Sequence, residues 1–146
     1  MRLFEWDSSL EINIEQIDDQ HRQLFQIVND YFLAMKEAKA YRNLSNTVST
    51  LIDYAQRHFS VEEELFVKHS YVHTEEHLRQ HADFLEKIES YRAMLDGDLA
   101  RVEGKSITVE VWEFMKGWLI NHIKVEDMKY RNDFIRTGAM AEITGN

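Results

Sequence analysis

The sequence predicts an all-α protein: an antiparallel up-down four-helix bundle with an N-terminal arm and a short C-terminal extension. Three observations support this prediction. The 146 residues include no proline and only 5 glycines, so neither common helix breaker interrupts the chain often. Apolar residues recur at three-and-four spacing along four long stretches. The connections between these stretches are short enough for consecutive helices to run antiparallel.

The composition indicates one soluble domain that covers residues 1–146. Hydrophobic residues make up 44% of the chain, which suits a globular protein of this length. The 17 Lys and Arg against 26 Asp and Glu give a formal net charge of −9, which argues against nucleic acid or an anionic membrane surface as the main partner. No apolar run reaches membrane-spanning length, and the first residues lack the features of a signal peptide. We therefore expect a cytoplasmic protein without membrane insertion.

The first two predicted helices each carry polar residues on an apolar face. Asp18 is the expected N-cap of the first helix, which runs to about Lys39. The face of that helix is formed by His21, Leu24, Phe25, Val28, Tyr31, Phe32 and Met35. The face of the second is formed by Leu44, Val48, Leu51, Ala55, His58, Glu62 and Leu65 or Phe66. Two histidines and a glutamate thus stand where the helical period demands apolar residues.

The third and fourth predicted helices show the same anomaly. Thr74 is the expected N-cap of the third helix and Gly97 its terminator. Its inward face reads His77, His81, Phe84, Ile88, Tyr91 and Leu95. A polar loop from Asp96 to Lys105 leads to the fourth helix, which Ser106 or Thr108 can cap. The fourth face reads Val111, Phe114, Trp118 and His122.

The two ends of the chain are predicted to pack on the bundle. The segment from Met1 to Ile17 forms the arm, and its apolar residues are Phe4, Trp6, Leu10, Ile12 and Ile14. The tail after Arg131 is expected to pack through Phe134 and Ile135.

Seven polar residues form four clusters, one on each helix, and alternating helix direction brings all four clusters to the same end of the bundle. They are His21, His58, Glu62, His77, His81, His122 and Asp127. Burying unpaired carboxylates and imidazoles costs several kcal/mol or more, about the whole stability of a small domain. Metal ions would remove this cost. Because the chain has no cysteine, the ligands must be nitrogen and oxygen atoms.

The spacing within each cluster bears on chelation. His58 with Glu62, and His77 with His81, are four residues apart, so each pair projects from one helix face. His122 and Asp127 are five apart, and in a regular α-helix the second side chain would be rotated by roughly 140° from the first. We expect either a π-bulge or a distorted helix end there.

Each cluster taken alone also has an ordinary structural explanation. A lone inward histidine is more often a hydrogen-bonded core residue than a ligand, and a single pair at helical spacing arises readily by chance. The agreement of four clusters at one end favours a shared metal site. His69 and His73 fall in the segment between the second and third helices, and we interpret both as solvated.

The order His, His-x3-Glu, His-x3-His, His-x4-Asp resembles the hemerythrins, in particular the bacterial single-domain type, the bacteriohemerythrins. The resemblance covers about residues 4–135 and includes Trp6 and the run from Ile17 to His21. It implies a non-haem centre of two Fe ions joined by an oxo or hydroxo bridge, which binds dioxygen reversibly. By this resemblance His77, His81 and His122 would hold one iron, His21 and His58 the other, and Glu62 and Asp127 would bridge them.

The number of coordination positions and the apolar residues around the ligands agree with a di-iron centre that binds dioxygen. Two six-coordinate ions offer about 12 positions, of which these ligands and one bridging oxygen fill about 11, leaving one open on the iron with two histidines. Residues one turn from the ligands could wall the oxygen pocket: Leu24, Phe59, Trp118 and Leu119. Trp118 and Leu119 match pocket residues of the family. A site rich in imidazole favours reversible binding over oxygen activation.

We therefore expect an oxygen-binding protein, not an enzyme, that serves transport, storage or delivery, with dioxygen as its ligand and an oxygen-consuming protein as a possible partner. The alternatives are a di-iron enzyme acting on nitric oxide, peroxide or ferrous iron, and an oxygen or redox sensor working through a separate partner. A four-helix phosphotransfer module fits poorly, since it needs one exposed histidine.

Overall fold

Four long helical segments build the structure, a computed structural model that describes residues 4–37, 41–97 and 105–145. They are α1 (Glu15–Lys36), α2 (Tyr41–Lys68), α3 (Thr74–Asp96), and a continuous rod in which α5 (Lys105–Asn121), the π-helix η2 (His122–Asp127) and α6 (Met128–Thr137) follow one another. A 3-10 turn, η1 (Ser8–Leu10), precedes the bundle and α7 (Ala139–Thr144) ends it. All regular structure in the described ranges is helical, which confirms the predicted all-α class.

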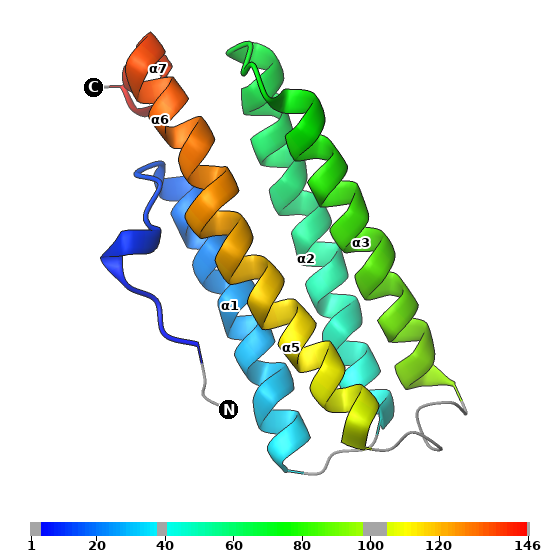
Figure 1. Ribbon diagram of the computed structural model, residues 1–146. Coiled ribbons are helices and arrows are strands. Elements are labelled where there is room, and N and C mark those ends of the chain that lie inside the picture. The colour runs from blue at the N-terminus through cyan, green and yellow to red at the C-terminus, as the bar shows by residue number, and fades with distance from the viewer. Residues whose placement is uncertain (1–3, 38–40, 98–104, 146) are drawn as a thin grey trace.

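The helices form the predicted up-down bundle (Figure 1). Consecutive helices run in opposite directions, and the N-terminal segment lies along the outside. α1 packs against α2 and α5, and α3 packs against the same two helices, so each helix has two neighbours. The C-terminal half of α2 and the N-terminal half of α3 therefore lie at the same end as the start of α1 and as η2.

Two hydrophobic clusters fill the bundle. The larger one, the central cluster, occupies the middle and the end away from the α2–α3 turn, and its largest buried side chains include Trp112, Tyr31 and Phe84. The smaller one, the end cluster, comprises Ile12, Ile14, Ile17, Phe66, Tyr71, Tyr130, Phe134 and Ala139. It joins the N-terminal segment and α6–α7 to the ends of α2 and α3, so both chain termini help to close one end of the bundle.

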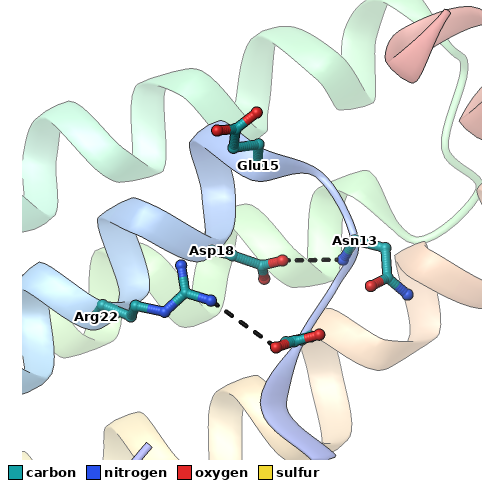
Figure 2. A pocket seen from close by; sticks show the side chains of 5 residues that line it. Asn13, Glu15, Asp18 and Arg22 are labelled. Carbon is teal, nitrogen blue, oxygen red and sulfur yellow. Dashed lines mark hydrogen bonds and ion pairs between the residues drawn. The ribbon is translucent and has the colours of Figure 1, made fainter. Parts of the chain in front are cut away.

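The N-terminal segment is held by Asp18, which is not the N-cap of α1 as predicted. α1 begins one turn earlier, at Glu15, with Ile14 at the N-cap. The buried Asp18 carboxylate accepts hydrogen bonds from the backbone N–H groups of Ile12 (2.8 Å) and Asn13 (3.1 Å). Asn13 has φ = 70°, a left-handed conformation that asparagine tolerates well. Figure 2 shows this turn, with the carboxylate of Asp18 directed toward Asn13. The guanidinium of Arg22 lies 3.8 Å from Oε1 of Glu11.

Other predicted boundaries also shift. α3 begins at Thr74 with His73 at the N-cap, and the Thr74 hydroxyl donates to the carbonyl of Tyr71. α5 begins at Lys105, ahead of both residues that were predicted to cap it, Ser106 and Thr108. The predicted end of the first helix near Lys39 and the middle of the loop from Asp96 to Lys105 lie outside the described residues.

The C-terminal segment continues the fourth helix instead of packing as a separate tail. α6 extends to Thr137, and Gly138, at φ = 85°, turns the chain into α7. Phe134 is fully buried as predicted, but Ile135 is 53% exposed, because the next residue of a helix is rotated by about 100° from the buried face. In the described ranges, no helix combines the length and the apolar character needed to cross a membrane.

Candidate metal centre

The seven predicted site residues lie between the two hydrophobic clusters. On α1, for example, His21 lies about one turn from Ile17 of the end cluster and from Leu24 of the central cluster. All seven are buried, none with more than 4% of its surface exposed. The structure therefore brings together in one interior region the residues that the helical period predicted to face inward.

Asp127 lies at the centre of one half of the cluster. Its Oδ1 is 3.2 Å from Nε2 of His77 and 3.2 Å from Nε2 of His122. Its Oδ2 is 3.2 Å from Nε2 of His21. One carboxylate thus faces imidazoles from three different helical segments with its two oxygens pointing in different directions.

Glu62 plays the corresponding part for the remaining two histidines. Its Oε1 is 3.1 Å from Nε2 of His58 and 3.3 Å from Nε2 of His81. Its Oε2 accepts a 2.7 Å hydrogen bond from the hydroxyl of Tyr130, which is itself fully buried. The carboxylate is therefore oriented from outside while its other oxygen faces the imidazoles.

The inward-facing atoms fall into two groups of metal-ligand type. One is formed by His77, His81 and His122, the other by His21, His58, Glu62 and Asp127, with potential ligand atoms within 4.8 Å of one another in each. Several of these buried atoms have no hydrogen-bond partner among the described residues, including Glu62 Oε1 and both oxygens of Asp127. Nε2 of His77 and Nε2 of His122 face each other at 3.1 Å. Buried nitrogen and oxygen atoms that converge in this way fit metal ions, which supply the missing partners.

The π-helix explains how His122 and Asp127 converge despite their spacing of five residues. η2 covers the interval from the one residue to the other, and both side chains are buried. A π-helix inserts one residue per turn relative to an α-helix, which returns the fifth residue to the same face. The π-bulge is thus the correct one of the two geometries that the spacing predicted.

Two outer hydrogen bonds orient imidazoles from behind, and sequence reasoning missed both. Nδ1 of His58 donates to Oε1 of Gln20 at 2.7 Å, and Nδ1 of His81 donates to Oε2 of Glu63 at 2.9 Å. Each bond fixes the tautomer that leaves Nε2 free to face inward. Gln20 precedes His21 and Glu63 follows Glu62 in the chain. This adjacency to predicted ligands was the one sequence feature that could have indicated their role.

The charges of the cluster shift its pKa values in opposite directions. Burial and the charge of Asp127 act to raise the pKa of Glu62, but the imidazoles of His58 and His81 outweigh them and lower it. Burial likewise opposes ionisation of Asp127, yet the adjoining histidines, His122 first, hold the pKa of Asp127 well below its ordinary value. Burial acts to lower the pKa of His58, but the charge of Glu62 outweighs it, so the pKa of His58 is raised. The site therefore favours anionic carboxylates.

Aromatic rings cover two of the imidazoles. Phe59 stacks on His81 with ring centroids 3.7 Å apart and planes 6° from parallel. Trp118 stacks on His122 at 4.3 Å and 11°. Leu24 and Leu119, the other two predicted wall residues, are buried in the central cluster with at most 1% exposed. The side of the site that faces the bundle centre is thus apolar.

The two remaining histidines lie outside the cluster. His73 is exposed, as predicted. The prediction of a solvated His69 was wrong, because its side chain is only 6% exposed and its ring packs against Phe134 at 5.7 Å between centroids. The continuation of α6 past Arg131, which the sequence did not suggest, supplies that cover.

A helical bundle with five buried imidazoles and two carboxylates at one end defines a class of protein that holds metal ions through nitrogen and oxygen ligands. Comparison with known families agrees: the model of the hemerythrin family described as "Hemerythrin HHE cation binding domain" matches residues 13–132. The chain belongs to the hemerythrin family. This confirms the resemblance that the order of the seven residues indicated.

Individual relatives extend over most of the chain. A bacteriohemerythrin of Clostridium acetobutylicum is 30% identical over 132 residues, covering 88% of this chain and 98% of the relative. A bacteriohemerythrin of Stenotrophomonas maltophilia is 29% identical over 130 residues, covering 89% of this chain and 80% of the relative. A myohemerythrin of Theromyzon tessulatum is 29% identical over 128 residues, covering 88% and 91% respectively.

Proposed function

We propose that this protein binds dioxygen reversibly at a pair of non-haem iron ions and serves oxygen transport, storage or delivery to an oxygen-consuming partner. The observation that carries the proposal is the buried cluster of five imidazoles and two carboxylates, divided into two groups of potential ligand atoms. Membership of the hemerythrin family supports iron as the metal. Relatives of this chain are named bacteriohemerythrin and myohemerythrin, and the reversible dioxygen binding that the resemblance to hemerythrins implies supports the carrier role.

The grouping of the side chains supports a role for each. His77, His81 and His122 would hold one ion, and His21 and His58 the other. Asp127, with one oxygen facing each group, and Glu62, whose Oε1 lies near both His58 and His81, would bridge the two ions. Fewer histidines on the second ion would leave a coordination position there for the ligand.

The surroundings of the site suit a carrier better than a catalyst. The iron pair, when bound, would supply the two electrons that dioxygen accepts on binding and returns on release. The role of the chain is to keep water and protons away, and Phe59, Trp118, Leu24 and Leu119 would form the apolar wall on the central side. Imidazole ligands also donate less negative charge than additional carboxylates, which favours release of the ligand unchanged.

The first test measures oxygen stoichiometry and reversibility. The reduced protein, loaded with two iron ions per chain, should take up about one dioxygen per iron pair and release it unchanged under vacuum, through repeated cycles. The measurement is an absorption spectrum with parallel iron analysis and gas uptake. One-way oxidation with turnover of nitric oxide, peroxide or ferrous iron would contradict the carrier role and indicate an enzyme.

The second test separates the proposed ligands from the other histidines. His58→Ala and Glu62→Ala should each lower the metal content below two ions per chain, because each removes a ligand from one of the two groups. His73→Ala is the matched control, since the His73 side chain is exposed and belongs to neither group of potential ligands. Metal analysis of the purified variants gives the answer, and equal metal content in all three variants would refute the ligand assignment.

A further inference from the structure

We propose that Glu63 adds an electronic difference between the two metal positions to their unequal numbers of histidines, by supplying His81 with an anionic hydrogen-bond partner where His58 has a neutral one. Glu63 is thus a positioning residue that acts through His81 and does not contact a metal. This inference rests on the proposed metal function and adds to it an internal asymmetry of the pair.

His58 and His81 contact the same carboxylate oxygen through Nε2 but differ in the hydrogen-bond partner of Nδ1. Both point Nε2 at the same atom, Glu62 Oε1, at 3.1 and 3.3 Å. Behind His58, Nδ1 donates to the side-chain amide oxygen of Gln20 at 2.7 Å. Behind His81, Nδ1 donates to the carboxylate of Glu63 at 2.9 Å. The Nδ1 hydrogen-bond partners of these two imidazoles therefore differ by one negative charge.

A carboxylate partner changes an imidazole ligand more than an amide does. Hydrogen bonds to an ionised acceptor are roughly twice as strong as neutral ones, and they draw the Nδ1 proton toward the acceptor. The opposite nitrogen, Nε2, becomes a stronger electron donor, which raises metal affinity and lowers the reduction potential of the bound ion. The ion held by His77, His81 and His122 should therefore be the more tightly held and the harder to reduce.

The surroundings of Glu63 allow it to play this part. Its side chain is 35% exposed, so water supports the negative charge while one oxygen reaches the buried imidazole. Phe59 stacks on the His81 ring and holds its plane, so the ring cannot turn away from Glu63 without losing that contact. By contrast, Nδ1 of His21 and Nδ1 of His77 have no hydrogen-bond partner among the residues that the structure describes. The anionic partner at Nδ1 thus distinguishes His81 from His21, His58 and His77.

The test uses Co²⁺ titration of the metal-free protein, which requires neither iron nor dioxygen. Wild type should bind two ions in separate steps. Glu63→Gln keeps an acceptor but removes the charge, and we expect one step to weaken by about 10- to 100-fold while the other changes little. Gln20→Glu should strengthen the weaker step and narrow the difference between the two. In the iron-loaded protein, Glu63→Gln should raise the reduction potential and Gln20→Glu should lower it.

Glu64→Gln is the matched control, because Glu64 is the next residue of α2, carries the same charge and is exposed. It should leave both Co²⁺ steps within about threefold of wild type, since surface charges are screened by solvent. Equal effects of Glu63→Gln and Glu64→Gln, or equal weakening of both steps by Glu63→Gln, would overturn the inference. Absence of two-ion binding in wild type would overturn the proposed metal site together with it, whereas failure to release dioxygen would contradict only the carrier role.

Discussion

Tyr130 orients the candidate ligand Glu62 but is not itself a candidate ligand. Its hydroxyl donates to Oε2 of Glu62, and the residue is fully buried. Burial raises the pKa of Tyr130 well above its ordinary value, and the charges of Glu62 and Asp127 raise it further. The phenol is therefore protonated at neutral pH and donates its hydrogen bond to Glu62 there.

Tyr130→Phe should destabilise the metal-free protein by about 1.5–3 kcal/mol. The substitution removes a hydrogen bond to a buried charged group and leaves Glu62 Oε2 without a partner. Metal content should stay at two ions per chain, because Tyr130 contacts only the outer oxygen. Urea unfolding followed by circular dichroism measures the loss.

Tyr31→Phe is the matched comparison. Tyr31 is also fully buried, but its hydroxyl donates to a neutral acceptor, the carbonyl of Thr108, at 2.8 Å. Loss of that bond should cost only about 0.5–1.5 kcal/mol. Equal losses in the two variants would show that the charge of Glu62 contributes nothing to the Tyr130 bond.

At the scale of elements, η2 is the one segment whose backbone departs from the α-helix within the site. His122 and Asp127 contact each other at 3.2 Å across five residues, and His58 and Glu62 contact each other at 3.1 Å across four in regular α2. The π-helix and the α-helix thus produce the same ligand contact. Because the wider turn of η2 takes up one extra residue, the buried faces of α5 and α6 point to the same side of the rod.

Deleting Val125 should therefore be tolerated. Val125 lies in η2 and is 46% exposed, so its removal takes away little packing. The deletion places His122 and the aspartate four residues apart, the spacing that suffices in α2. We expect a folded protein that still binds two Co²⁺ ions per chain, with a change of less than about 1 kcal/mol in the free energy of unfolding.

Deletion of Gly117 provides the control. Gly117 is exposed and lies in α5, where an added side chain would meet nothing within 4 Å. Here no extra residue absorbs the change, so every later side chain rotates by about 100° around the helix axis. His122 and Asp127 leave the site, and two-ion binding should be lost. If both deletions abolished binding, the π-turn itself would be required.

The site could be predicted from sequence because its residues violate a strong local rule. His58 and Glu62 stand in an otherwise apolar stripe, and the helical period forces such residues inward whatever they bind. Alternating helix direction then brings the four clusters to one end. The spacing of His122 and Asp127 similarly required a local distortion, and it is present as a π-helix.

What could not be predicted depends on contacts between elements that obey no such period. Gln20 and Glu63 stand at positions that a period of 3.6 assigns to the helix surface, and only the packing of α1 and α3 against α2 brings them to His58 and His81. Asp18 looks like a helix cap, but the chain before it folds back and takes its hydrogen bonds instead. His69 looks solvated until α6 covers it.

At the scale of the whole molecule, a charged cluster separates two hydrophobic clusters that could otherwise form one core. In the metal-free protein the two carboxylates are stabilised by the imidazoles and, for Glu62, also by the hydroxyl of Tyr130. The folded pKa values of Glu62 and Asp127 lie below their ordinary values of 4.5 and 3.8, so their contribution to stability is present above those pH values and is lost as the pH falls. The folded pKa of His58 lies above its ordinary 6.5, so its contribution is present below pH 6.5 and is lost as the pH rises.

Metal binding should reverse the loss of stability with rising pH that the raised pKa of His58 causes. The metal-free protein should be most stable between about pH 4.5 and 6.5 and should weaken from pH 6 to pH 8. With Co²⁺ at a constant concentration that is 100 times its dissociation constant at pH 7, stability should increase by about 2.7 kcal/mol per ion at that pH. The gain should be larger at pH 8, because bound imidazoles must lose their protons and the dissociation constant therefore falls as the pH rises. Urea midpoints measured from pH 5 to pH 8, with and without Co²⁺, should therefore diverge as the pH rises. In His58→Ala the metal-free decline between pH 6 and pH 8 should become smaller, whereas parallel curves for the loaded and metal-free wild type would show that the ions do not bind through these imidazoles.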